Sequence, residues 1–220
     1  MQKNSISRSS HLMALLALVL SLGHFTVYAD NICEPKHVLL TNPTAKQTDA
    51  CLHWIWYSLG RKTAIDKSFT QQFIRTLLPS SNKQVIKQNP ANLITPDYLK
   101  LAEVINLLDS HELIKTYLDF IVFTAGTADE TRSFGLGKLY TLQAPTVLNA
   151  LSTYTNIEQR KIINKLAWGL VNNFYPNINK NNYKRLITGE HWELITNKHP
   201  KKLLLQEIEI EVIKIVESYS

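Results

Sequence analysis

Apolar side chains recur at intervals of three and four residues along most of the chain after residue 47, the spacing that gathers them on one face of an α-helix. The stripe is cleanest between Asn156 and Pro176, where charged and amide side chains fall on the opposite face. The stretches 97–108 and 110–125 are apolar nearly all round, which is typical of helices in the middle of a fold. The pattern therefore predicts an all-α protein, either an irregular multi-helix bundle or an α-solenoid-like stack of helical hairpins.

Capping residues set the expected starts of several helices. Thr48 or Asp49 can cap a first helix that stops at Gly60. Thr95 followed by Pro96 predicts an N-cap and the first residue of a central helix. The segments 97–125 and 145–175 then look like two helical pairs of similar outline, although no fixed repeat period accompanies them.

Three glycines mark an expected loop in the middle of the chain. Gly126, Gly135 and Gly137 lie close together, and glycine commonly serves where a chain reverses direction. Pro145 then opens a short helix that runs to about Thr153. We therefore expect a loop between the central helical pair and the next one.

The last apolar segment, 204–216, has two interpretations. Glu207 to Val212 alternates between charged and apolar residues, as a half-buried strand does. A helical stripe nevertheless continues from Leu204 through Ile208 to Ile215, and no other segment offers a partner strand. Helix is the favoured prediction.

Residues 1–29 have the three parts of a cleavable signal peptide. Lys3 and Arg8 form a positive beginning, an apolar run covers 12–22, and Val27-Tyr-Ala29 places small residues before the expected cleavage at Asp30. The apolar run is shorter than the roughly 20 residues that cross a bilayer. The sequence predicts an exported protein, periplasmic or secreted, whose mature part has no membrane span.

Cysteine usage fits that compartment. Cys33 and Cys51 are the two cysteines of the chain, and two cysteines in an oxidising space usually pair. We expect a structural disulfide that ties an N-terminal arm, residues 30–47, to a single helical domain, residues 48–220.

Charge and composition narrow the partners. The formal net charge of +6 includes Lys3 and Arg8, so the expected mature chain carries only +4, and its basic residues are dispersed. Nucleic-acid binders usually gather basic residues in a stripe with aromatics between them. The sequence predicts a protein partner, no nucleic acid and no cofactor.

Glu190-His191-Trp192-Glu193 is the densest cluster of reactive side chains. Two carboxylates beside an imidazole can perform acid–base chemistry, so Glu190, His191 and Glu193 are the candidate catalytic residues. Neighbours in sequence rarely span a substrate, however, and Trp192 can instead pack inward while the charges stay in water. His111-Glu112 lacks the second histidine of a zinc-peptidase helix, and no metal site is expected.

The candidate binding residues are Arg132, in the expected glycine loop, and the tryptophans Trp54, Trp56 and Trp192. Loops on a helical scaffold often carry binding residues, and tryptophan is favoured at interfaces. The sequence favours an exported partner-binding helical protein without catalytic activity, such as an adaptor, inhibitor, immunity protein or effector. The alternative is a cell-envelope hydrolase that uses residues 190–193.

Overall fold

The computed structural model describes residue 33 and residues 44–78, 95–126, 130–174, 177–179, 182–184, 187 and 201–219. All regular secondary structure in these residues is helical, which confirms the all-α prediction. The helices are α3 (Ala45–Gly60), α4 (Lys67–Leu77), α6 (Tyr98–Leu108), α7 (His111–Thr124), α8 (Thr131–Leu151), α9 (Asn156–Phe174) and α11 (Lys202–Ser218).

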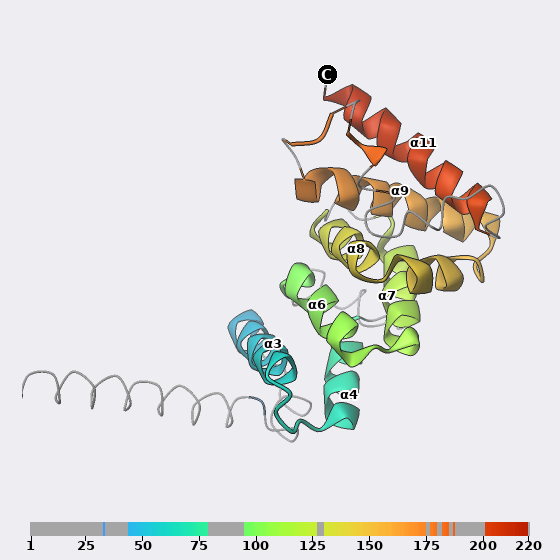
Figure 1. Ribbon diagram of the computed structural model, residues 1–220. Coiled ribbons are helices and arrows are strands. Elements are labelled where there is room, and N and C mark those ends of the chain that lie inside the picture. Colours follow the sequence, from blue (N-terminus) through green and yellow to red (C-terminus); the bar gives the residue numbers. More distant parts are fainter. Residues whose placement is uncertain are drawn as a thin grey trace, which may run out of the picture.

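The helices form an elongated stack in which chain order follows position (Figure 1). One row consists of α3, α6 and α8, each packed on the next. The second row consists of α4, α7, α9 and α11, again each packed on the next. The two rows meet most extensively where α8 packs on α9. The core runs through the whole stack and is built from the apolar stripes of both rows.

Several neighbouring helices run parallel, as the contacts of α3 with α6 show. The backbone N–H of Asp97 donates to Asp49 at 3.1 Å, and one turn later Lys100 Nζ lies 2.8 Å from His53 Nδ1. Helices α9 and α11 behave likewise, since Lys201 bonds Ser152 where both helices begin and Tyr219 bonds Asn172 where both end.

Two predicted helix starts are wrong by a few residues. Helix α3 begins at Ala45, before Thr48, because Thr44 and Gln47 form a reciprocal capping box; the hydroxyl of Thr44 accepts from Gln47 N at 3.3 Å. Helix α6 is capped by Asp97 rather than Thr95, since the Asp97 carboxylate accepts the N–H of Lys100 at 3.0 Å.

The expected glycine loop is wrong as well. Gly135 and Gly137 lie inside α8, and the break near Pro145 is a kink at Gln143, where φ is −142° and ψ is 46°. A β-carbon on Gly137 would lie 2.6 Å from the backbone carbon of Gly169 in α9. These glycines therefore allow helices to touch along their backbones.

The C-terminal segment is a helix, as favoured. Leu204, Ile208 and Val212 are buried on one face of α11, whereas Ile210 is 52% exposed on the other. The alternation of Glu207 to Val212 is therefore the surface of an amphipathic helix. The expected signal peptide and most of the N-terminal arm, residues 34–43, fall outside the described residues.

Candidate partner-binding surface

An aromatic and cationic surface covers the exposed side of α3 and α6 at one end of the stack. The Trp56 ring has two close neighbours: the His53 ring, with centroids 5.6 Å apart, and the Lys100 ammonium, 5.0 Å from the Trp56 ring centroid. Lys100 also contacts His53 Nδ1 at 2.8 Å. One cation thus bridges two helices over an aromatic side chain.

The next residue of α3, Tyr57, also has a cation over its ring. Tyr57 is 44% exposed, and the Arg61 guanidinium lies 4.3 Å from its ring centroid. A cation held over an aromatic face is attracted by the ring quadrupole and loses part of its rotamer freedom before any partner arrives. We call His53, Trp56, Tyr57, Arg61 and Lys100 the α3–α6 surface.

The two tryptophans predicted for binding differ in their surroundings. Trp54 and Trp56 are both half-buried and both pack against the hydrophobic core. Only Trp56 has a cation over its ring among the contacts of the described residues. Sequence spacing could not separate them, because Lys100 lies 44 positions away on another helix.

Arg132 does not lie in an exposed loop. It is 7% exposed in the first turn of α8, and its guanidinium lies 5.2 Å from the ring centroid of Phe120. Its carbonyl oxygen accepts a hydrogen bond from the buried Tyr117 hydroxyl at 3.0 Å. Arg132 therefore belongs to the interior of the stack.

The predicted catalytic cluster lies outside the described residues. Glu190, His191, Trp192 and Glu193 fall in 188–200, so the structure does not place them. Glu112, the other acidic residue beside a histidine, pairs with Arg75 on α4 at 2.7 Å. That surface ion pair joins two helices and leaves Glu112 in a structural position.

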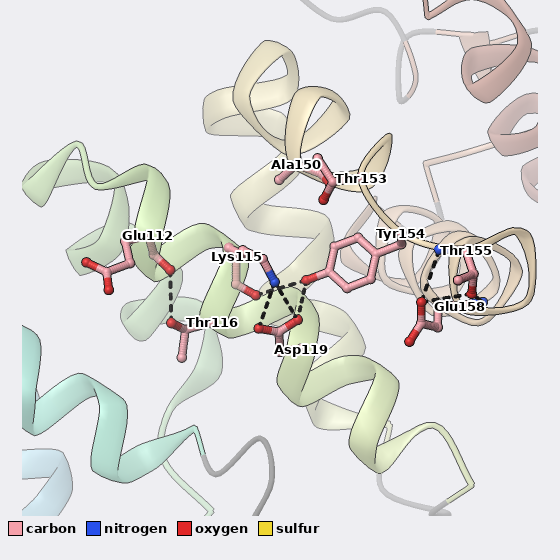
Figure 2. Close-up of polar contacts among 9 residues, drawn as sticks. All are labelled: Glu112, Lys115, Thr116, Asp119, Ala150, Thr153, Tyr154, Thr155 and Glu158. Atoms are coloured by element: carbon pink, nitrogen blue, oxygen red, sulfur yellow. Dashed lines mark hydrogen bonds and ion pairs between the residues drawn. The ribbon is translucent and has the colours of Figure 1, made fainter.

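A polar cluster connects α7 to the turn before α9 (Figure 2). The Tyr154 hydroxyl lies 2.5 Å from Asp119 Oδ1, and the Lys115 ammonium contacts both Asp119 oxygens at 3.1 Å. Lys115 Nζ also lies 5.1 Å from the Tyr154 ring centroid. These side chains bond to one another, so the cluster fastens the turn before α9 to α7.

The same view shows why α9 begins where it does. The Thr155 N–H and hydroxyl both donate to Glu158 Oε2, at 3.0 and 2.8 Å (Figure 2). These hydrogen bonds hold the pKa of Glu158 below its usual range. The Thr155 hydroxyl also accepts the N–H of Glu158 at 3.4 Å, so Thr155 caps this helix.

Two tyrosines make the stability of this fold sensitive to alkali. Burial raises the pKa of Tyr154, the Asp119 carboxylate raises it further, and burial alone raises the pKa of Tyr140, whose hydroxyl donates to Ile187 O at 3.0 Å. Folding thus favours the neutral phenols. Their contribution is complete below the ordinary phenol pKa of about 10 and is lost as the pH rises above it.

We predict that Tyr154→Phe weakens this alkaline loss. In thermal melts between about pH 8 and pH 11, which brackets the ordinary phenol pKa, the wild type should lose more of its melting temperature than the variant. Tyr57→Phe, which changes an exposed phenol, should follow the wild type. If the wild type and Tyr154→Phe lost melting temperature in parallel, Tyr154 would have the same pKa in the folded and unfolded states, contrary to this prediction.

An open groove lies between α9 and α11. Its volume is about 460 Å³, and its walls are Arg160, Ile163, Asn164, Glu207, Ile210 and Glu211. The walls carry charges of both signs, and Glu211 is paired with Lys214 at 2.6 Å. The lining of the groove therefore does not favour a partner of one charge, whereas the α3–α6 surface combines cations with aromatic rings.

Cys33 and Cys51 lie in contact as two buried free thiols, not as the predicted disulfide. A hydrogen bond between the two thiols, together with burial, raises the pKa of Cys51. The structure therefore does not support the predicted disulfide.

Within the described part of the chain, no group of three or more histidine, cysteine or acidic side chains could hold a metal ion. The same residues contain no helix with the length and apolar character of a bilayer span. Comparison with known proteins finds no matching family model, curated protein or solved structure, so function must be inferred from the geometry of this chain.

Proposed function

We propose that this chain is an exported helical protein that binds another protein and has no catalytic activity of its own. The observation that carries the proposal is the α3–α6 surface, where Trp56 and Tyr57 each hold a cation over the ring. Aromatic and arginine side chains dominate the energy of protein interfaces, and rings already held in place cost less entropy on binding.

The arrangement of helices supports the same proposal. Helices packed in two rows form an extended surface like that of an α-solenoid, and such proteins commonly bind partners along the stack. Bonds such as Lys138 to Glu103 at 3.1 Å and Gln143 to Asn106 at 3.0 Å connect α8 to α6 along the row that carries the surface. The surface is therefore mounted on a continuous scaffold.

Replacing Tyr57 by alanine tests the proposal. The exported protein would serve as bait against envelope and culture extracts, and the affinity of the captured partner would then be measured by interferometry. Tyr57→Ala should weaken binding by about tenfold or more, which is roughly the 1.4 kcal/mol or greater expected of an anchoring aromatic. Thermal melting would confirm that the variant remains folded.

Phe174→Ala provides the matched control. Phe174 is 42% exposed, close to the 44% of Tyr57, but lies at the far end of α9. Equal losses in both variants, or none in Tyr57→Ala, would contradict binding through the α3–α6 surface. A bait that captures nothing at high concentration would shift attention to hydrolysis, with Glu190→Gln and Glu193→Gln as the first variants.

Export and the disulfide belong to the same proposal. Cleavage before Asp30 follows from the sequence pattern of 1–29, and N-terminal sequencing of the secreted or periplasmic form tests it. The contact between Cys33 and Cys51 supports a disulfide in an oxidising compartment. A product that begins at Met1 would overturn the export proposal.

A further inference from the structure

We infer that the α3–α6 surface recognises an acidic, extended segment of its partner, with carboxylates about three to four residues apart. This inference rests on the proposed function and specifies the chemistry of the partner. Its basis is a line of exposed side chains along α3 that includes Lys46 and Arg61 and is joined by Lys100 of α6, together with the ring faces that Arg61 and Lys100 occupy.

The line follows from helical geometry. Positions 46, 50, 53, 57 and 61 are separated by three or four residues and so share one side of α3 and its C-terminal cap. Lys46, His53, Tyr57 and Arg61 on this side are exposed, and only Ala50 interrupts them. Lys100 joins the line from α6 at the level of His53.

The cations of this line are available to a partner. Among the described residues, no carboxylate forms an ion pair with Lys46, Arg61 or Lys100. The two acidic side chains nearby are engaged by backbone donors, since Asp49 accepts the N–H of Asp97 and Asp97 accepts the N–H of Lys100. Asp49 and Asp97 keep their charges, but neither is ion-paired with Lys46, Arg61 or Lys100, and these three cations outnumber the two carboxylates.

The spacing of the cations matches an extended chain. A helix rises about 1.5 Å per residue, so Lys46 and Arg61 lie roughly 10 Å before and 12 Å after His53, where Lys100 joins the line. An extended peptide advances about 3.3 Å per residue. Carboxylates every third or fourth residue would thus reach Lys46, Lys100 and Arg61 in turn.

The aromatic rings favour a peptide over a nucleic acid or a membrane. Binding of single-stranded nucleic acid uses free ring faces on which bases stack. The cations Lys100 and Arg61 already lie over Trp56 and Tyr57. Trp56 also packs against the core, so it is held in place and cannot be inserted into a bilayer. The groups left to contact a partner are the Lys100 and Arg61 cations above these rings, and they can bind carboxylates of an extended peptide.

Synthetic peptides test this inference. The probe is a short fluorescein-labelled peptide with glutamate at every third or fourth position between glycine and serine, and its control carries glutamine instead. Fluorescence anisotropy with the exported protein should give saturable binding for the glutamate peptide and at least tenfold weaker binding for the glutamine peptide. Raising the salt should weaken the interaction, because exposed charges are screened.

Variants identify the surface. Arg61→Gln and Lys100→Gln should each weaken the affinity for the glutamate peptide by about two- to fivefold. This loss corresponds to about 0.4–1 kcal/mol, as expected for an exposed charge contact. Lys161→Gln, the same change at an exposed position of α9, should leave the affinity unchanged. Equal binding of both peptides, or equal effects at Lys161 and Arg61, would overturn the inference.

Two further probes and the captured partner complete the test. Binding of a thymidine oligonucleotide, or of phosphatidylglycerol vesicles, as tight as that of the glutamate peptide would overturn acidic-peptide recognition in favour of a general polyanion or a membrane. Loss of partner binding in Tyr57→Ala without loss in Arg61→Gln and Lys100→Gln would overturn the acidic segment while the proposed function stands. Loss in all three variants supports both.

Discussion

Replacing Gly169 by alanine should destabilise this protein more than any other change of a single methyl group that the structure suggests. A β-carbon at Gly169 would lie 1.8 Å from the carbonyl oxygen of Ser133 and 2.5 Å from its carbonyl carbon. Both atoms belong to the backbone of α8, so no side-chain rotation can relieve the clash. Helices α8 and α9 would have to move apart at the most extensive contact in the stack.

The expected size follows from measured effects of overpacking. Extra atoms forced into a packed interior cost about 1–3 kcal/mol and sometimes more. Helix propensity acts in the opposite direction, since alanine is favoured over glycine by up to about 1 kcal/mol inside a helix. We expect a net loss of about 3 kcal/mol, because the clash is with backbone. At roughly 2–4 °C per kcal/mol for a chain of this size, the melting temperature should fall by about 6–12 °C.

Gly60→Ala is the control, because it adds the same methyl group to the last residue of α3, where no heavy atom lies within 4 Å of the new carbon. That variant should melt at the wild-type temperature or slightly above it. Differential scanning calorimetry of the two variants measures both effects. If Gly169→Ala melted with the wild type, the close approach of α8 and α9 would be wrong.

This contact also explains an error of sequence interpretation. Gly135 and Gly137 suggest a loop because glycine serves equally well where a chain turns and where two backbones touch. The choice depends on Gly169, which lies on another helix and gives no signal near residue 135. A pattern of apolar residues reports which face of a helix is buried but not how near the neighbouring backbone comes.

Other features were within reach of the sequence. The stripes of 156–174 and 204–216 predict helices α9 and α11 because one buried face is a local property of the chain. The start of α3 could also have been found, since Thr44 and Gln47 have the spacing of a capping box. Thr48 misled because threonine is acceptable as a cap and also inside a helix.

The candidate site was only half predictable. Trp56 stands out in the sequence as an interface residue, but its cation comes from Lys100 on another helix. The pairings within the row are irregular, since Asp49 meets Asp97 whereas Glu103 meets Lys138. The two contacts join residues at different separations along the chain, so they do not follow a fixed repeat. The spacing of residues in the sequence therefore does not indicate which side chains meet in this surface.

Under the proposed export to an oxidising compartment, reducing the protein is expected to lower its melting temperature about as much as Gly169→Ala does. Cys33 and Cys51 are buried in contact, so the bond can form with little movement of the fold. Exchange with a disulfide oxidant such as oxidised glutathione would join the two sulfurs, release their protons and reduce the oxidant to two thiols. The 17 residues between the cysteines would then form a closed loop.

A loop of this length stabilises by roughly 3 kcal/mol in the chain-entropy estimate, equivalent to about 6–12 °C in melting temperature. The protein should be isolated from the compartment in which the proposed disulfide forms, because the oxidant is found there. A doubly substituted Cys33→Ser, Cys51→Ser variant should melt at the same temperature with and without reductant.

Intact mass spectrometry with and without thiol alkylation shows whether Cys33 and Cys51 are joined by a disulfide, and it does so independently of any stability measurement. The exported protein should resist alkylation until it is reduced and should then accept one alkyl group at each cysteine. Two alkylated cysteines in the unreduced, unfolded protein would show that the thiols remain free after export.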